Sequence, residues 1–378
     1  MSAAVKYISS TMVGAPTMSG VLGGLLAVLD AALVNGFNLV TVNSLVVAGG
    51  VATATVNASH NFIAGRVILL AGATPAGLNG EKRIIAVTSP TVFTFDATGI
   101  ADQTATGTIS AKVAPLGWER TSAASNVNYY RSLDPMSSRY GMFAHDNVTA
   151  TRTYVGAYER LSAAGAGLSG FMGYGQWIKS ITADATVRGW HLIGDSRGFY
   201  LLTNTRSAGV FSVYFFGDPI SKKSGDIFGA LITGVNASLI SANTPMAGCL
   251  STSDRVAAAG FMSRPLGSAT SLQQTVMIVG AAHTGATSPA LSGSTSYSLL
   301  SYPNTPDNSW MAGEVNVITG GMLRATMPGL YHCAQTAFSV PAPLLGKLAG
   351  RVLSYFNVGP AAGGASGGLY FDTTGPWR

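Results

Sequence analysis

The stretch WHLIGDSRGFYLLT, residues 190–203, decides the fold. Two apolar runs, Trp190–Ile193 and Phe199–Thr203, flank Gly194–Gly198, a segment of glycine, aspartate, serine and arginine. Short apolar runs on both sides of such a turn signal are typical of two antiparallel strands. A third run, Val210–Phe216, follows after a polar connection. The stretch therefore predicts a mostly β fold.

The pattern continues through residues 118–378, which we predict to form a larger β-rich domain. All five tryptophans lie in this part of the chain. Its long connections 280–295 and 359–368 are rich in Gly, Ser and Pro, and loops of this length usually bind a ligand or pack against a neighbouring subunit. The further predicted strands are Thr275–Val279, Glu314–Ile318, Arg351–Asn357 and Leu369–Asp372.

Residues 40–114 predict a second, smaller unit. Six short β runs alternate with turn segments such as Gly49-Gly50, and this spacing favours a small β-sandwich or barrel module. Pro115–Gly117 marks its boundary with the larger domain. The predicted strands are Ser44–Ala48, Val51–Val56, Arg66–Ala71, Lys82–Thr88, Val92–Phe95 and Thr106–Val113.

Residues 1–36 favour a short helical segment. Ser19 can cap a helix, apolar residues recur after it at helical spacing, and Asn35-Gly36 supplies a stop. We expect this N-terminal segment to attach the protein to its neighbours, through an apolar stripe that the rest of the segment does not need. The predicted assembly contacts on it are Leu22, Leu25, Leu26 and Leu29.

A further predicted assembly contact is Trp377, near the other end of the sequence. Chain ends are usually polar and frayed, so a large aromatic residue there indicates a docked tail. Two positions remain open for it at this point: the sheet of the larger domain, or the surface of a neighbouring subunit.

Charge is scarce in this chain. Asp, Glu, Lys and Arg make up 10% of 378 residues, whereas a soluble domain has about 25%. So thin a charged surface favours association, and we expect partners that include copies of the same chain. The basic residues behind the net charge of +6 are scattered, which argues against nucleic-acid binding. The longest apolar stretch, Val21–Val34, is interrupted by Asp30 and falls short of the ~18–20 residues of a membrane span, so we expect no membrane insertion.

Two glycine-containing stretches match the sequence patterns of known functional sites. Gly194–Gly198 matches the G-x-S-x-G pattern of serine hydrolases, which places the serine on a strand-to-helix turn. Here Phe199–Leu202 reads as a returning strand, so we predict that Ser196 is a hairpin residue and not a nucleophile. Gly165–Gly170 matches G-x-G-x-x-G but lacks the strand before it and the helix after it that a dinucleotide site needs, and we expect a flexible loop.

The remaining chemistry-bearing residues are dispersed, and we predict no catalytic residue, no cofactor and no metal site. The five histidines lack metal-ligand spacing. Cys249 and Cys333 are too far apart for a metal clip, and we expect reduced, buried thiols, with a single disulfide left open. The chain has 16 acidic residues, and most of the candidates for a catalytic pair fall in turn-like contexts, but carboxylate pairs that cleave glycans need no sequence signature. The turn-like acids are Asp96, Asp102, Asp195, Asp218, Asp226 and Asp307.

Three passages resemble structural proteins of tailed bacteriophage virions. The first covers Leu45–Ala111 and includes VAGGVATATV and LAGATPAGLNGEKRI, which is similar to a small β module of phage structural proteins. The second covers Trp190–Asp226, with WHLIGDSRGFYLLT and YFFGDPISKKSGD. The third is GGLYFDTTGPWR, Gly367–Arg378. The resemblance spans most of the chain and brings no catalytic residues with it.

The resemblance implies a non-enzymatic virion protein of the phage tail, in the baseplate, the tail tip or a collar appendage. It would be made in the host cytoplasm and would contact other virion proteins, copies of itself and a host-surface glycan or receptor. Two alternatives stay open: a capsid decoration protein, which would share this composition, and a tail enzyme acting on a host-surface glycan.

Overall fold

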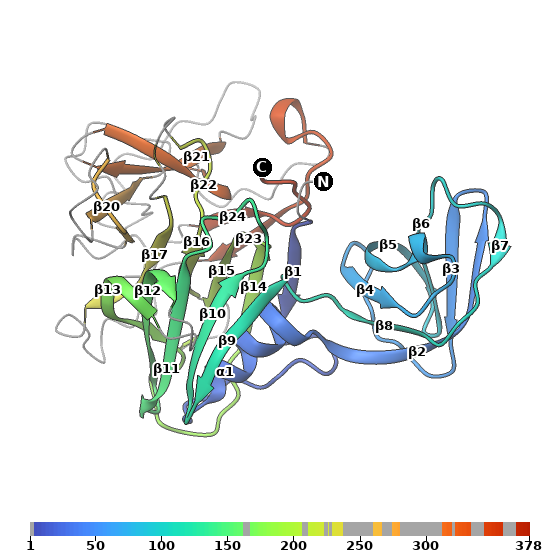
Figure 1. Cartoon of the computed structure of the whole chain (residues 1–378), viewed down its shortest axis with the longest axis horizontal. Helices are drawn as coiled ribbons and strands as arrows, with labels where there is room; N and C mark the ends of the chain where they lie inside the picture. Colours follow the sequence, from blue (N-terminus) through green and yellow to red (C-terminus); the bar gives the residue numbers. More distant parts are fainter. Residues whose placement is uncertain are drawn as a thin grey trace.

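The computed structural model describes residues 4–161, 167–205, 211–222, 226, 229–236, 260–266, 274–279, 312–319, 322–333, 344–357 and 368–378. Within them the chain is mostly β, as the sequence predicts, and its strands form three sheets (Figure 1). The helical segments are α1 (Gly24–Leu29), the π-helical η1 (Asp30–Asn35), and the 3-10 turns η2 (Ala76–Leu78) and η5 (Gly346–Leu348). Cys249 and the connection 280–295 lie outside the described residues, and 359–368 lies almost wholly outside them.

Residues 37–113 form a closed barrel, one of the two architectures that the sequence leaves open. Around the barrel the order is β3-β6-β5-β4-β8-β2, and a further β3–β2 pairing closes the ring. The interior is filled by side chains, of which Leu45, Phe93 and Phe95 are fully buried. The strands are β2 (Phe37–Ala48), β3 (Val51–Val56), β4 (Val67–Ala71), β5 (Gly80–Ser89), β6 (Val92–Asp96) and β8 (Ile109–Val113), with the short β7 (Gln103–Thr104) beside β2.

The largest sheet has eleven strands in the order β1-β14-β15-β16-β17-β19-β20-β21-β22-β24-β23. It contains the predicted hairpin: β14 pairs with β15 up to Asp195↔Gly198, so Ser196 and Arg197 form a two-residue loop. Its strands are β1 (Lys6–Ser9), β14 (Trp190–Asp195), β15 (Gly198–Thr203), β16 (Ser212–Gly217), β17 (Leu231–Thr233), β19 (Gly260–Met262), β20 (Gln274–Val279), β21 (Ala312–Thr319), β22 (Met322–Cys333), β23 (Leu353–Asn357) and β24 (Gly368–Asp372).

The third sheet has six strands in the order β18-β13-β12-β11-β10-β9. The pairing register shifts at Tyr129/Tyr130 and at Val155/Ala157, which marks β bulges, and none of these strands is among those predicted from the sequence. They are β9 (Trp118–Ala124), β10 (Val127–Ser132), β11 (Gly141–Thr149), β12 (Arg152–Leu161), β13 (Gly167–Ile178) and β18 (Val235–Asn236).

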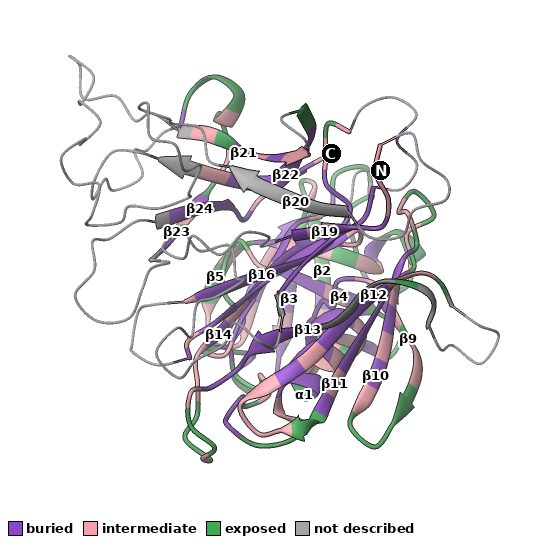
Figure 2. Ribbon diagram, turned by 90° about the vertical axis from the view of Figure 1, so that its left-hand side faces the viewer, coloured by how far each residue is buried: buried purple, intermediate pink, exposed green. Residues whose placement is uncertain are grey.

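Strand β15 lies in the middle of three layers. On one face, the Phe199 ring contacts Trp118 and Trp177 of the six-stranded sheet, at centroid distances of 5.5 and 6.1 Å. On the other face, Tyr200 contacts Phe371 at 5.1 Å and Trp377 at 5.8 Å, because the eleven-stranded sheet folds back over itself. All six residues of β15 are therefore buried, as are those of the neighbouring strand β16 (Figure 2), which explains why FYLLT reads as a continuous apolar run.

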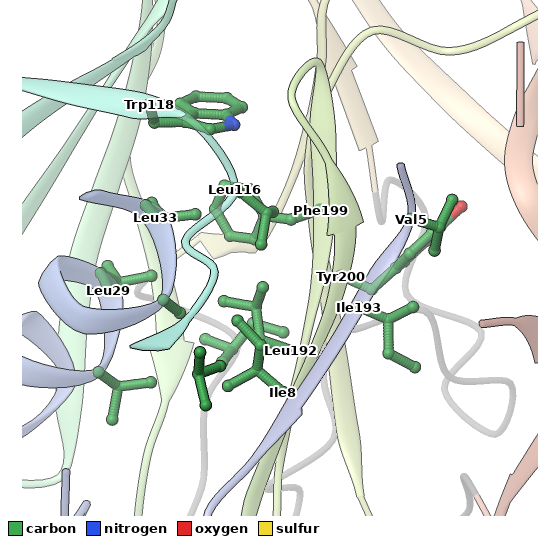
Figure 3. Close-up of a cluster of buried hydrophobic side chains, with 14 of the residues drawn as sticks. Val5, Ile8, Leu29, Leu33, Leu116, Trp118, Leu192, Ile193, Phe199 and Tyr200 are labelled. Carbon is green, nitrogen blue, oxygen red and sulfur yellow. The ribbon is translucent and has the colours of Figure 1, made fainter. Parts of the chain in front are cut away.

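The N-terminal segment is part of the core, which corrects the expectation that it forms a separate, purely helical unit. Strand β1 pairs with β14, and helix α1 begins at Gly24 and not after Ser19. Figure 3 shows Leu29 and Leu33 pointing toward Leu116 and the strands beyond it. The three residues Leu25, Leu26 and Leu29 are at most 5% exposed, and so they pack within their own chain.

Candidate functional site

The turn between β14 and β15 carries the one hydrolase-like motif, and Asp195 builds it. The Asp195 carboxylate accepts hydrogen bonds from the backbone N–H groups of Arg197 and Gly198, at 2.8 and 3.0 Å. Gly217 on β16 lies against this turn: a β-carbon on Gly217 would stand 2.3 Å from Cα of Gly198. The G-x-S-x-G pattern is thus a close-packed hairpin, as the returning strand predicted, and no helix follows the serine.

The hydroxyl of Ser196 is engaged by a carboxylate. Its Oγ donates a 2.6 Å hydrogen bond to Asp134 Oδ2, which also accepts from Arg197 Nε at 3.2 Å. Burial by itself raises the pKa of Asp134, but the hydrogen bonds from Ser196 and the Met136 N–H, with the charge of Arg197, hold that pKa below its usual value. A carboxylate with a lowered pKa is a weak base, and in this arrangement it orients the Ser196 hydroxyl.

The aspartates near this turn are all engaged. Arg378 Nε donates to Asp195 Oδ2 at 2.9 Å, and its Nη1 donates to the Asp218 carbonyl at 2.7 Å. The Asp218 carboxylate accepts from the backbone N–H and the hydroxyl of Ser138. The carboxylates of Asp195 and Asp218 thus accept hydrogen bonds that hold the local backbone in place, as expected for acids in turns.

The other turn-like acids have comparable roles. Asp96 accepts from Thr98, and Asp102 accepts from the Gly49 N–H. Asp226 pairs with Arg324, and both side chains are 1% exposed. Asp307 lies outside the described residues. Within the described ranges, no three His, Cys, Asp or Glu side chains gather as metal ligands would.

Trp377 docks on its own chain, the first of the two positions that the sequence leaves open. The side chain is 7% exposed, and its Nε1 donates to the Asp372 carbonyl at 3.0 Å. Its ring meets Tyr200 edge-on. Trp377 therefore belongs to the core between the folded-back halves of the sheet.

A set of cations fixes the barrel to the rest of the molecule. Lys6 of β1 is 3% exposed, and its Nζ donates to Glu81 Oε1 of the barrel at 2.5 Å and to the Pro115 carbonyl at 2.7 Å. Burial lowers the pKa of Lys6, and the neighbouring Glu81 carboxylate opposes that shift. From the barrel side, Arg83 Nη2 donates to the carbonyls of Val5 and Thr374, at 2.9 and 3.0 Å.

An aromatic contact completes this junction. The guanidinium of Arg66 lies over the Tyr7 ring, 3.8 Å from its centroid, and the Tyr7 hydroxyl is 3.0 Å from His191 Nδ1. Burial, with a smaller effect of the Arg66 charge, lowers the pKa of His191 to about 4. The junction therefore joins a neutral imidazole, a phenol ring and a cation. These basic residues are scattered along the sequence, and each of them contacts a residue that lies far away in the chain.

Large apolar side chains are exposed on both the barrel and the rest of the molecule. Leu345 is 81% exposed, Met136 72% and Leu39 71%. Leu22, a predicted assembly contact, is 49% exposed, unlike its three buried companions. The other members of this group are Val13, Val21, Val46, Val51, Ile63, Ile85, Val87, Leu133, Val148, Val187, Met322, Leu323, Val352 and Tyr355.

Two further sequence expectations can be placed. Gly167–Gly170 of the G-x-G-x-x-G motif belong to strand β13, so the expected flexible loop is wrong for these residues, whereas Gly165 and Ala166 lie outside the described residues.

In the described part of the chain, no helix has the length and apolar character needed to cross a membrane.

The chain matches no protein-family model and no curated protein.

Proposed function

We propose that this chain is a non-enzymatic structural protein of a bacteriophage virion, located in the tail as part of the baseplate, the tail tip or a collar appendage. The observation that carries the proposal is the surface. Charged residues are 10% of the chain, while side chains as large as Leu345, Met136 and Leu39 are more than two-thirds exposed. Scattered exposed apolar residues are ordinary, but so many with so little charge favour a surface that other proteins cover.

The junction supports a mechanical role for the barrel. Lys6, Arg66 and Arg83 connect it to β1 and to the segment around Thr374 by an ion pair, hydrogen bonds and a cation–π contact. A barrel fastened at several points holds its outer surface at a set place relative to the eleven-stranded sheet. Such a unit suits a spacer between subunits, and Figure 1 shows it projecting to one side of the other two sheets.

The motif-bearing turn supports a role without catalysis. Ser196 donates to a carboxylate that also binds Arg197, and Asp195 is committed to the turn and to Arg378. We infer that this cluster stabilises the fold.

Gold-labelled antibody against the chain, applied to virions of the phage that encodes it and viewed by negative-stain microscopy, tests the location. Label at the tail supports the proposal. Label distributed over the capsid would instead identify a decoration protein, and absence of the chain from purified virions would refute a virion role. A reducing-sugar assay with host polysaccharide gives the independent check on catalysis, for which we expect no release above that of heat-inactivated protein.

A further inference from the structure

The most enclosed pair of opposite charges in the described residues joins Asp146 of β11 to Lys179, the residue that follows β13. Lys179 Nζ donates to Asp146 Oδ1, and both side chains are 0% exposed. A buried ion pair of this kind gives up its hydration on both sides, and such pairs stabilise proteins weakly at best. The enclosure therefore calls for a reason other than ionic attraction.

The surrounding groups hold the acid and the amine in one orientation. The Thr153 hydroxyl donates to Asp146 Oδ1 at 2.9 Å, and the backbone N–H of Leu25 donates to Oδ2 at 3.1 Å. The amine is held from the other side by the Val21 carbonyl, at 2.5 Å. Both carboxyl oxygens thus face a donor, and the nitrogen is kept beside the carboxyl group.

We propose that Asp146 and Lys179 are joined by an intramolecular isopeptide bond that the folded chain forms by itself. The neutral amine of Lys179 attacks the carboxyl carbon of protonated Asp146. A C–N bond forms, one C–O bond breaks, and the departing hydroxyl leaves as water with a proton from the nitrogen. The product is a secondary amide, and the step needs no oxidant, metal or nucleotide.

The environment favours the reactive forms of both groups. Burial is the largest influence on each: it raises the pKa of Asp146 and lowers the pKa of Lys179, although the contact between the two groups opposes both shifts. A proton passed from the ammonium to the carboxylate gives the uncharged acid and amine. The hydrogen bonds from Thr153 and Leu25 then stabilise negative charge on the oxygens during attack. The fixed geometry replaces an encounter between two separate molecules.

The bond would tie β11 to the end of β13 across the intervening strand β12. Thr153 of β12 pairs with Trp177 of β13, so the cross-link would span three neighbouring strands close to the buried tryptophan. Val21 and Leu25 close the site from the N-terminal segment, which means that the bond forms after that segment has packed. A covalent tie of this type works in a reducing compartment, where disulfides do not persist.

Mass spectrometry of the full chain tests the proposal. The folded wild-type protein, checked by circular dichroism and then denatured, should weigh less than its sequence by the mass of one water molecule. Trypsin should yield a branched peptide that joins Tyr140–Arg152 to Leu161–Arg188, since trypsin does not cleave after an amidated lysine.

The matched control is Lys179→Arg, which keeps the positive charge but removes the amine, and it should have its full sequence mass. A wild-type chain at its full sequence mass, cleaved normally after Lys179, would overturn the proposal. So would a water loss that persists in Lys179→Arg, because the loss would then lie elsewhere. Both readings are made on denatured protein, and the wild-type mass decides the question even if the variant folds poorly.

Discussion

The indole nitrogen of Trp377 lies only 2.0 Å from the point where a β-carbon on Gly329 would stand. Gly329 also has a φ of +60°, in the left-handed region that disfavours side chains. Two independent reasons therefore demand glycine here, and together they leave the room that the docked tryptophan fills.

Gly329→Ala should lower the free energy of unfolding by about 2–5 kcal/mol, because it adds overpacking to backbone strain. Gly346→Ala is the matched control: its φ is +61°, but nothing lies within 4 Å of the added carbon. That variant should lose about 1–2 kcal/mol. Denaturant unfolding measures the free energy of unfolding of both variants. Equal losses would mean that the Trp377 side chain can move away from the added carbon without destabilising the protein.

Trp377→Ala should cost about 3–5 kcal/mol, as expected for truncating a buried aromatic side chain. The loss comes from the contact with Tyr200 and from the hydrogen bond to the Asp372 carbonyl. Deleting residues 375–378 should cost at least as much, since it also removes the Arg378 contacts with Asp195. Thermal unfolding that matches the wild type in both variants would show that this tail contributes nothing to the fold.

Acid should weaken the protein through His191. Its pKa is about 4 in the folded chain against an ordinary value of 6.5, so the unfolded chain binds more protons in this interval. The contribution of His191 to the free energy of unfolding is fully present above about pH 6.5. It is lost as the pH drops toward 4, by up to about 3 kcal/mol. His191→Phe should flatten that part of the curve measured by denaturant unfolding. A wild-type slope that survives in His191→Phe would assign it to other groups.

Lys6→Ala should loosen the barrel. The Pro115 carbonyl loses its donor and Glu81 loses its ion pair, at a cost of about 1–3 kcal/mol. Limited proteolysis should then cut faster near Gly36 and Pro115–Gly117, where the barrel joins the other sheets. Lys82→Ala is the control, because Lys82 Nζ bonds the Gly77 carbonyl within the barrel. Equal cleavage of the two variants would show that Lys6 does not hold the junction.

Leu22 and Leu25 should respond differently to the same substitution. Leu25→Asp places an unpaired charge at a position that is 1% exposed and should prevent folding. Leu22→Asp changes a side chain that is 49% exposed, so the chain should fold with normal circular dichroism. If Leu22 is an assembly contact, that variant should also fail to enter virions and sediment as a smaller species than the wild type. Normal incorporation would remove Leu22 from the interface.

The hairpin and the barrel could be predicted because their signals are local. The 190–203 stretch has contiguous apolar runs around a polar turn, and the barrel strands are separated by turn residues. The six-stranded sheet lacks a clear apolar–polar alternation in the sequence. The buried positions of β10 are Asn128, Tyr130 and Ser132, and the first four residues of β11 are all buried. The helical pattern after Ser19 showed a real apolar face, but no periodicity tells whether that face meets the same chain or another.

The contacts that fix the barrel and enclose Asp146 are not local. Lys6 and Glu81 are 75 residues apart, and Asp146 and Lys179 are 33 apart. No spacing rule joins residues so distant, since their meeting depends on how whole sheets pack. The sequence indicated the turn role of Ser196 from the strand after it, but its partner Asp134 lies 62 residues away.

The β2–β3 pairing that closes the barrel also removes two strand edges from the surface of this module. An open sheet presents unpaired backbone groups that recruit further strands, and many proteins block such edges with charged side chains. This chain has few charges to spend in that way. Closing the ring pairs β2 and β3 with each other, so their backbone groups are not available to recruit strands from another molecule. In this module, closure of the barrel therefore protects the strand edges, a function that charged side chains have in many other proteins.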